Sequence, residues 1–163
     1  MFEYKNLVEL SDVVPTAIID LKYATADNFS HQQQYDFPLC LIHKDIAPKL
    51  QKASQLAENL GLRLKIWDAY RPMAVQKRFY DLTPDDQKDY VAPPEDSRHP
   101  KGITIDLTLT DASGVELDMP TGYDDFSERA HSDFVSLTPI QIKNRETLMS
   151  IMKSAGFENY PFE

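Results

Sequence analysis

A histidine and an aspartate near the middle of the chain have the types and spacing of metal ligands. Alternating apolar and polar residues from Ile103 to Thr110 predict a strand with one buried face. Asp106 falls on its polar face, where aspartate is disfavoured, and His99 precedes it across a bend whose Gly102 can adopt a positive φ. An imidazole and a carboxylate suit a divalent metal, zinc first. The alternative is a polar sheet face beside a surface histidine, and two residues alone do not decide between them.

Arg71 is a second candidate, because it lies where a predicted strand passes into a predicted helix. Alternation from Leu62 to Trp67 predicts the strand, and Pro72 suits the first position of a helix. Functional residues gather at such junctions. The alternative is a structural ion pair between Arg71 and Asp68 or another acidic residue.

The elements that must position these residues can be predicted from periodicity. Amphipathic helices are expected from Lys44 to Gly61 and from Pro139 to Ala155, each ended by a glycine. Residues 7–20 are expected to be extended and to end in a strand. Residues 115–119 are expected to return as a hairpin partner of the strand at 103–110. This order of elements predicts an α+β domain.

Composition excludes several classes of protein. The 163 residues suffice for one domain with one hydrophobic core, and 42% of them are hydrophobic. The net charge of −9 argues against binding of nucleic acid and of anionic membranes, because both need clustered Lys and Arg. No apolar run approaches a membrane span, and residues 1–6 do not resemble a signal peptide.

The chain has one cysteine, Cys40, which excludes an internal disulfide and fits a reducing compartment. We therefore expect a cytoplasmic protein. Because Cys40 lies in an apolar segment, it is expected to be a small buried hydrophobic residue and not a nucleophile.

Several motifs together resemble one enzyme family. Ser97-x-His99-x-x-Gly102-x-x-x-Asp106 resembles the zinc signature of the D-alanyl-D-alanine dipeptidases of the vancomycin-resistance type, within the wider zinc D,D-peptidases. Four other segments resemble the dipeptidase pattern in its order: Asp20–Thr25, Trp67–Pro72, Asp124–His131, and Asn144-Arg145 before Gly156-Phe157. The resemblance therefore covers nearly the whole chain.

The resemblance implies one zinc ion per chain, with His99 and Asp106 as its first two ligands. In the family a later Glu-Trp-Trp-His supplies a general base and the third ligand. Glu163 matches the base, and the sequence ends there without the histidine. His31, His43 or His131 could replace it, but none lies in a motif that favours it. The expectation is a shortened form of a longer protein.

The resemblance also implies roles for residues that touch the substrate. Arg71 matches the arginine that stabilises the tetrahedral intermediate, and Asp124 matches the acid that receives the free ammonium of the dipeptide. Ser97 and Tyr23 match positions that line the dipeptide pocket. Thr104 departs from the family, which usually has alanine there, and this leaves fine specificity open.

The implied fold is one compact α+β domain over residues 1–163. It would have a small central, mostly antiparallel sheet flanked by helices, the hedgehog-like architecture of zinc D,D-peptidases. The implied activity is zinc-dependent hydrolysis of D-alanyl-D-alanine to two D-alanines, with a small D,D-dipeptide as partner and neither nucleic acid nor membrane. Two alternatives remain: a zinc D,D-carboxypeptidase or L,D-peptidase acting on longer cell-wall peptides, and a non-catalytic binding protein. Oligomeric state and physiological role (resistance, wall turnover or nutrient use) are left open.

Overall fold

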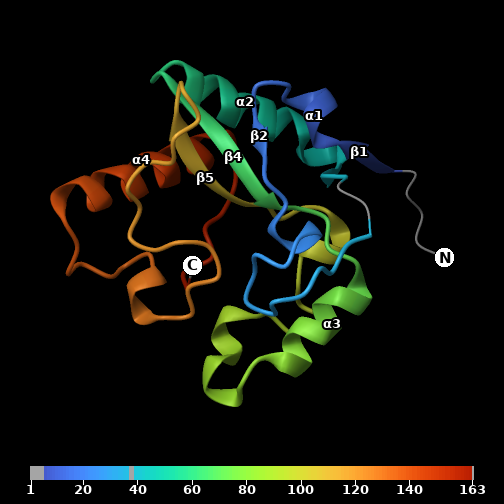
Figure 1. The fold of residues 1–163 in the computed structure, drawn as a ribbon. Coiled ribbons are helices and arrows are strands. Elements are labelled where there is room, and N and C mark those ends of the chain that lie inside the picture. Colours follow the sequence, from blue (N-terminus) through green and yellow to red (C-terminus); the bar gives the residue numbers. More distant parts are fainter. Residues whose placement is uncertain (1–5, 37–38, 163) are drawn as a thin grey trace.

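Strands β4 (Leu62–Asp68) and β5 (Asp106–Asp111) pair antiparallel at the centre of the protein. Strand β2 (Ile18–Ile19) pairs parallel with the other edge of β4, which gives a sheet of order β2-β4-β5. A second sheet joins β1 (Leu7–Glu9) and β3 (Leu41–His43) antiparallel. The computed structural model describes residues 6–36 and 39–162 (Figure 1).

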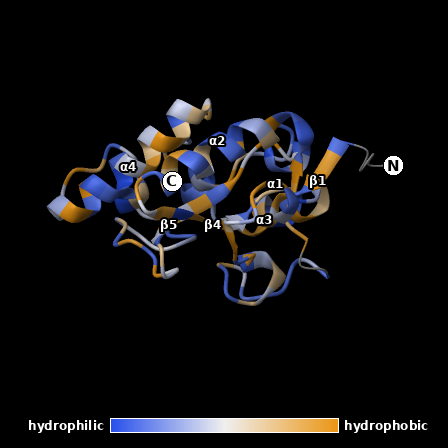
Figure 2. Ribbon diagram, turned by 90° about the horizontal axis from the view of Figure 1, so that it is seen from above, coloured by the Kyte–Doolittle hydropathy of each residue, from blue (hydrophilic) through white to orange (hydrophobic). Residues whose placement is uncertain are grey.

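Two amphipathic helices cover one side of the central sheet: α2 (Ala47–Glu58) and α4 (Pro139–Ala155). Both alternate between hydrophilic and hydrophobic residues along their length (Figure 2). The apolar stripe of each faces inward, and Leu50 from α2 and Ile151 from α4 are buried in one aliphatic cluster with Leu64 and Leu109 of the sheet. Burial of these side chains is the main favourable contribution to folding.

The ends of α4 follow from local sequence. Thr138 and Gln141 form a capping box, in which each side chain bonds the backbone N–H of the other residue. Pro139 occupies the first turn, and Gly156 ends the helix with φ 93°. The predicted bounds of this helix are confirmed.

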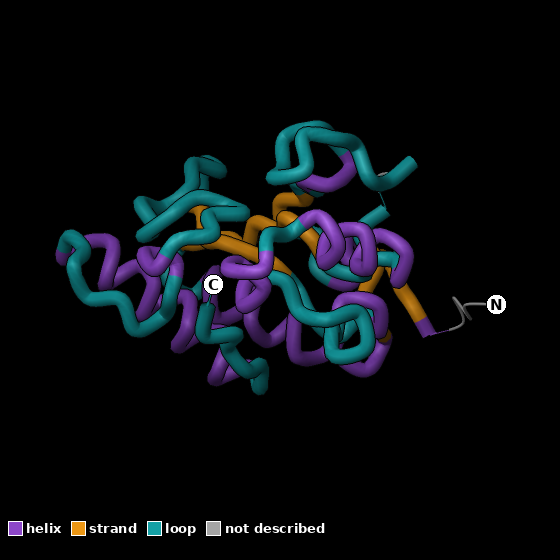
Figure 3. The backbone as a smooth tube through the Cα atoms, turned by 90° about the horizontal axis from the view of Figure 1, so that it is seen from below, coloured by secondary structure: helices purple, strands orange, loops and turns teal. Residues whose placement is uncertain are grey.

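The connections that carry the candidate site lie beyond the ends of β4 and β5. Helix α3 (Met73–Leu82) follows β4 with Pro72 as its N-cap, and α1 (Leu10–Val13) is a single turn near the N-terminus. Figure 3 shows the strands running through the middle of the molecule between helices and long loops. Short 3-10 helices interrupt these loops, at Lys22–Ala24, Lys44–Ile46, Asp85–Tyr90, His99–Lys101 and Glu128–Ala130.

Three local predictions need correction. Residues 7–20 are not extended throughout, because α1 lies between β1 and β2. β5 begins at Asp106 and not at Ile103, and its polar face is covered, since Thr108 and Thr110 are 2% and 0% exposed. Residues 115–119 do return antiparallel to β5 as predicted, with a bridge between Thr110 and Glu116 and hydrogen bonds from Asp111 N to Val115 O and from Leu117 N to Leu109 O, but in the described part of the chain they form no strand.

The predicted fold class is confirmed as an α+β domain with a small, largely antiparallel sheet flanked by helices. Cys40 is buried as predicted, and burial raises the pKa of its thiol to about 12. Across residues 6–36 and 39–162, no helix combines the length and apolar character needed to cross a membrane.

Candidate metal centre and active site

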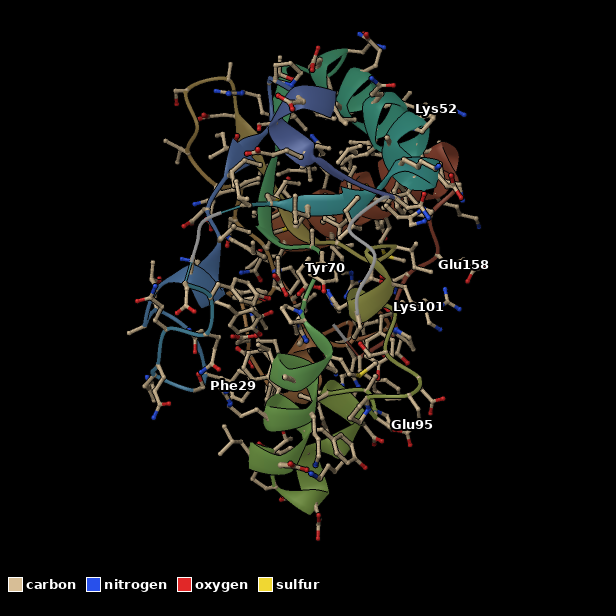
Figure 4. All side chains as sticks on the ribbon, turned by 90° about the vertical axis from the view of Figure 1, so that its right-hand side faces the viewer. Phe29, Lys52, Tyr70, Glu95, Lys101 and Glu158 are labelled. Atoms are coloured by element: carbon tan, nitrogen blue, oxygen red, sulfur yellow. The ribbon has the colours of Figure 1, made fainter. Side chains whose placement is uncertain are left out.

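A register shift between β4 and β5 brings two carboxylates together. The strands pair regularly as far as Ile66 opposite Leu107, and then Asp68 pairs with Asp106, which leaves Trp67 as an extra residue on β4. An extra residue of this kind kinks one strand and changes the direction of the next side chain. Asp68 and Asp106 therefore meet at the end of the sheet, where β4 leads through Tyr70 towards α3 (Figure 4).

Gly102 bends the chain so that His99 reaches Asp106. Its φ is 68°, and a Cβ there would lie 2.8 Å from Leu7 Cδ2 and 3.0 Å from His43 N. The carbonyl of Gly102 accepts a hydrogen bond from the His43 backbone N–H at 2.7 Å. Only glycine satisfies both the backbone angle and this close approach. The bend predicted before the strand is confirmed.

His99 and Asp106 face each other with the spacing of two ligands of one ion. His99 Nε2 lies 3.3 Å from Asp106 Oδ1. Two atoms each about 2.0–2.2 Å from a tetrahedral metal ion lie roughly 3.4 Å apart. His99 Nδ1 lies 2.7 Å from the Ala69 carbonyl, to which it donates, so that in the neutral ring the Nε2 lone pair faces a carboxylate oxygen. Such an arrangement needs a proton or a cation between the two atoms, and the donor set fits a metal.

The charges of this pair shift both pKa values. Burial and Arg71 lower the pKa of His99, but Asp106 raises it, and the resulting pKa lies above the usual value. Burial alone would raise the pKa of Asp106, but His99 and Arg71 lower it by more. The resulting pKa lies below the usual value, so that the carboxyl stays ionised. Each group therefore favours the charged form of the other.

Asp68 lies near His99 and Asp106, and the three form a cluster of two carboxylates and one imidazole. The carboxylate oxygens of Asp68 are, however, already used by other partners. Its ligand atom lies within 4.8 Å of those of His99 and Asp106. However, Oδ1 accepts from the Tyr35 hydroxyl at 2.8 Å, and Oδ2 accepts from Arg71 Nε at 2.8 Å. His99 Nδ1 lies 3.8 Å from Asp68 Oδ2, on the side of the ring away from the Nε2 that faces Asp106. Asp68 thus holds Arg71, which lies beside the His99–Asp106 pair.

Arg71 lies beside the His99–Asp106 pair, and each of its three guanidinium nitrogens has an acceptor: Asp68 for Nε, Asp106 for Nη2 and Gln76 for Nη1. Its Nη2 donates to Asp106 Oδ2 at 3.2 Å, and the same oxygen accepts from the Tyr123 hydroxyl at 3.1 Å. The predicted ion pair with Asp68 also forms. Arg71 therefore forms the structural ion pair and also lies at the candidate site. These bonds leave Asp106 Oδ1 directed at His99.

Asp124 lies close to these groups on a separate segment. Its carboxylate accepts from the Tyr23 hydroxyl at 2.9 Å and from the Phe29 backbone N–H at 3.2 Å. Burial raises the pKa of Asp124 to about 6, although the Tyr23 hydrogen bond lowers it. The backbone of Asp124 adopts a φ of 57°, which is uncommon for a residue other than glycine. Backbone strain of this kind concentrates at functional sites.

A pocket of about 370 Å³ opens beside Asp124. Its walls combine aromatic and charged side chains, including those of Phe29, Trp67 and Tyr123, with Lys22 and Glu116. Figure 4 shows Phe29 on the side of the molecule away from Glu95 and Lys101. Because aromatic and charged side chains both line it, the pocket can hold a small polar molecule with one end at the Asp124 carboxylate.

The other predicted site residues lie in several places. Ser97 is buried two residues before His99, and Tyr23 is 3% exposed with its ring 5.0 Å from the Arg71 guanidinium carbon. Glu163 lies outside the described residues. Of the alternative histidines, His31 lines the pocket beside Asp124. His43 Nδ1 accepts from the Asp45 backbone N–H, and His131 Nε2 bonds the Tyr90 hydroxyl.

Sequence reasoning did not foresee the parts played by Asp68, Tyr35, Gln76 and Tyr123. The sequence predicts Asp68 only as an ion-pair partner of Arg71. The available indication was an aspartate at the end of an apolar strand, since a buried charge needs partners. Tyr35 and Tyr123 lie in loops without periodicity, and no pattern predicted their contacts.

The fold and this site define a class, a candidate metal-dependent hydrolase with a buried histidine–aspartate pair beside an arginine. Comparison with known families is more specific. Residues 3–163 match the peptidase family described as D-ala-D-ala dipeptidase. The chain belongs to this family and is a peptidase.

Curated proteins also resemble the chain over most of its length. The D-alanyl-D-alanine dipeptidase of Escherichia coli (strain K12) is 40% identical over 158 residues, which cover 96% of this chain and 81% of the relative. Proteins of the same name are similar to it in Enterococcus faecalis (34% identical; 88% of this chain, 81% of the relative) and in Enterococcus faecium (33%; 94% and 86%).

Proposed function

We propose that this protein hydrolyses D-alanyl-D-alanine to two D-alanines with the help of one zinc ion. The facing pair of His99 Nε2 and Asp106 Oδ1, 3.3 Å apart, carries this proposal. A buried imidazole and a carboxylate form a donor set that zinc prefers. Three relatives that bear the name D-alanyl-D-alanine dipeptidase support the substrate.

Zinc bound here would act as a Lewis acid and lower the pKa of a water molecule to about 7. Glu163 would accept the proton of the attacking water and pass it to the leaving amine. The Arg71 guanidinium would stabilise negative charge developing on the peptide carbonyl oxygen, because it is permanently charged and close to Asp106. The resemblance gives a histidine as the third ligand, and His99 and Asp106 match its first two ligands in this sequence.

Asp124 would select free dipeptides by pairing with their ammonium group. Its carboxylate lines the 370 Å³ pocket and is held by Tyr23 and Phe29. A longer peptide has an amide in place of that ammonium, and burying an amide against a carboxylate leaves the charge unpaired. Ser97 and Tyr23 would complete the walls around the dipeptide. A cytoplasmic location is part of the proposal, since Cys40 has no second cysteine to pair with.

The test measures D-alanine release and bound metal on the same preparation. We expect D-alanyl-D-alanine to be cleaved, L-alanyl-L-alanine and N-acetyl-D-alanyl-D-alanine to resist, and activity to disappear with a chelator and return with zinc. Cleavage of the N-acetylated dipeptide or of a tripeptide at a comparable rate would instead favour a D,D-carboxypeptidase or L,D-peptidase. Absence of hydrolysis in a zinc-loaded protein would contradict the proposal.

A further inference from the structure

Gln76 is a buried amide that bonds the arginine of the site. It lies in α3 and is 1% exposed. Its Oε1 accepts from Arg71 Nη1 at 2.8 Å, and its Nε2 donates to the Ala92 carbonyl at 2.7 Å. Because arginine only donates and a carbonyl only accepts, these partners fix the orientation of the amide. Both ends of the Gln76 side chain are therefore used.

Each nitrogen of the Arg71 guanidinium has its own acceptor. Nε donates to Asp68 and Nη2 to Asp106, both along one edge of the group, whereas Nη1 on the opposite edge donates to Gln76. The rings of Tyr23 and Phe79 lie 5.0 and 5.1 Å from the guanidinium carbon. Three of five N–H groups are thus engaged by described residues, which leaves one on each terminal nitrogen.

Removal of the Gln76 contact would leave Arg71 held along one edge only. Asp68 and Asp106 are both carboxylates, and either could take a two-pronged contact with Nε and Nη2. Such a contact would turn the free N–H groups away from their present direction. A neutral amide on the opposite edge prevents this rotation without adding a third negative charge to the cluster.

Gln76 also ties Arg71 to the segment that leads to His99. Ala92 belongs to the loop between α3 and the 3-10 helix at His99–Lys101. The backbone N–H of Arg71 donates to the His99 carbonyl at 3.2 Å. Arg71 and the metal pair are therefore connected through Gln76 on one side and through the backbone on the other.

We propose that Gln76 is a positioning residue, which holds the Arg71 guanidinium in the plane and direction needed to meet a developing oxyanion. The inference rests on the proposed function, since it assigns Arg71 that task. Gln76 does not contact the substrate, and its effect passes through Arg71. Its loss should lower kcat more than it changes KM, because the oriented charge acts in the transition state.

The test compares Gln76→Met, which keeps the volume but removes the amide, with Gln55→Met on the exposed side of α2. For Gln76→Met we expect kcat for D-alanyl-D-alanine to fall about tenfold, with KM changed by less than about twofold. Affinity for a phosphinate analogue of the dipeptide should fall by the same factor, and zinc content should stay equal to wild type. An unchanged kcat, or an equal loss in both variants, would overturn the proposal.

A second readout does not depend on activity. In the metal-free protein, restricted rotation should give separate NMR signals for the Nη protons of Arg71. We expect these signals to merge in Gln76→Met and to stay separate in Gln55→Met and in Gln76→Glu, which keeps the acceptor oxygen. Signals that stay separate in Gln76→Met would overturn the proposal. If the wild type cleaves no D-alanyl-D-alanine, the proposed function fails, and these spectra still decide whether Gln76 orients Arg71.

Discussion

Two regions of strand β4 differ sharply in what surrounds them. Leu64 and Ile66 are buried in an aliphatic cluster against α2 and α4, where shape and apolar area decide the packing. A short distance along the same strand, Asp68 is 0% exposed and bonds Tyr35 and Arg71. The first region gains free energy from burial, and the second loses it because charged groups leave water.

In the polar region, hydrogen bonds among the buried groups offset the free-energy cost of removing them from water. Asp68 and Asp106 share Arg71, and Tyr35, Tyr123 and Gln76 complete the hydrogen bonds, so that few polar atoms are left without partners among the described residues. Buried polar networks of this kind are rigid but contribute little net stability. We infer that the aliphatic region holds the fold and the polar region holds the geometry of the site. The following predictions test this division.

The largest effect should come from the metal pair. His99→Ala should abolish stoichiometric zinc binding and lower activity on the order of 10³-fold, because a metal supplies several kcal/mol of transition-state stabilisation. His131→Ala is the matched control, since His131 bonds Tyr90 within an aromatic cluster away from the pair. Metal analysis and steady-state kinetics would measure both. Full zinc content in His99→Ala would contradict the assignment.

Truncation in the aliphatic region should affect stability instead. Leu50 is 0% exposed, and Leu50→Ala should lower the free energy of unfolding by about 2–5 kcal/mol, since it leaves a cavity. Leu60→Ala, at a site 60% exposed, should change it by less than about 0.5 kcal/mol. Denaturant unfolding would measure both. Activity per folded molecule should match wild type in each, and a loss of kcat in folded Leu50→Ala would break the division.

The smallest effect should be a pH dependence of substrate binding. The pKa of Asp124 is raised to about 6 by burial, so that its carboxylate is ionised above this pH and protonated below it. The dissociation constant of a non-cleavable D,D-dipeptide analogue should therefore rise about tenfold per unit as pH falls below about 6. Tyr23→Phe removes a hydrogen bond that lowers this pKa and should move the transition to higher pH. A constant affinity between about pH 5 and 7 would exclude Asp124 as the ammonium partner.

The sequence determined the features that depend on near neighbours in the chain. The period of α4 and its caps, the alternation along β4, and the need for glycine at residue 102 follow from local backbone geometry. The motif containing His99 and Asp106 predicted that these two side chains would meet, since one bend connects them, and they lie 3.3 Å apart. These predictions held because each involves interactions within a few residues. The role of His99 and Asp106 as metal ligands stays a prediction.

Only the tertiary structure decided which distant groups complete the site. The extra residue at Trp67 sets Asp68 opposite Asp106, and packing over β5 buries Thr108 and Thr110 although their pattern predicted an open face. Likewise, the sequence pattern of α3 does not distinguish Gln76 from the other polar residues of the helix. Its contact with Arg71 requires β4 and α3 to meet at a particular angle. Strand register and helix placement result from the packing of the whole core, and local periodicity does not contain that information.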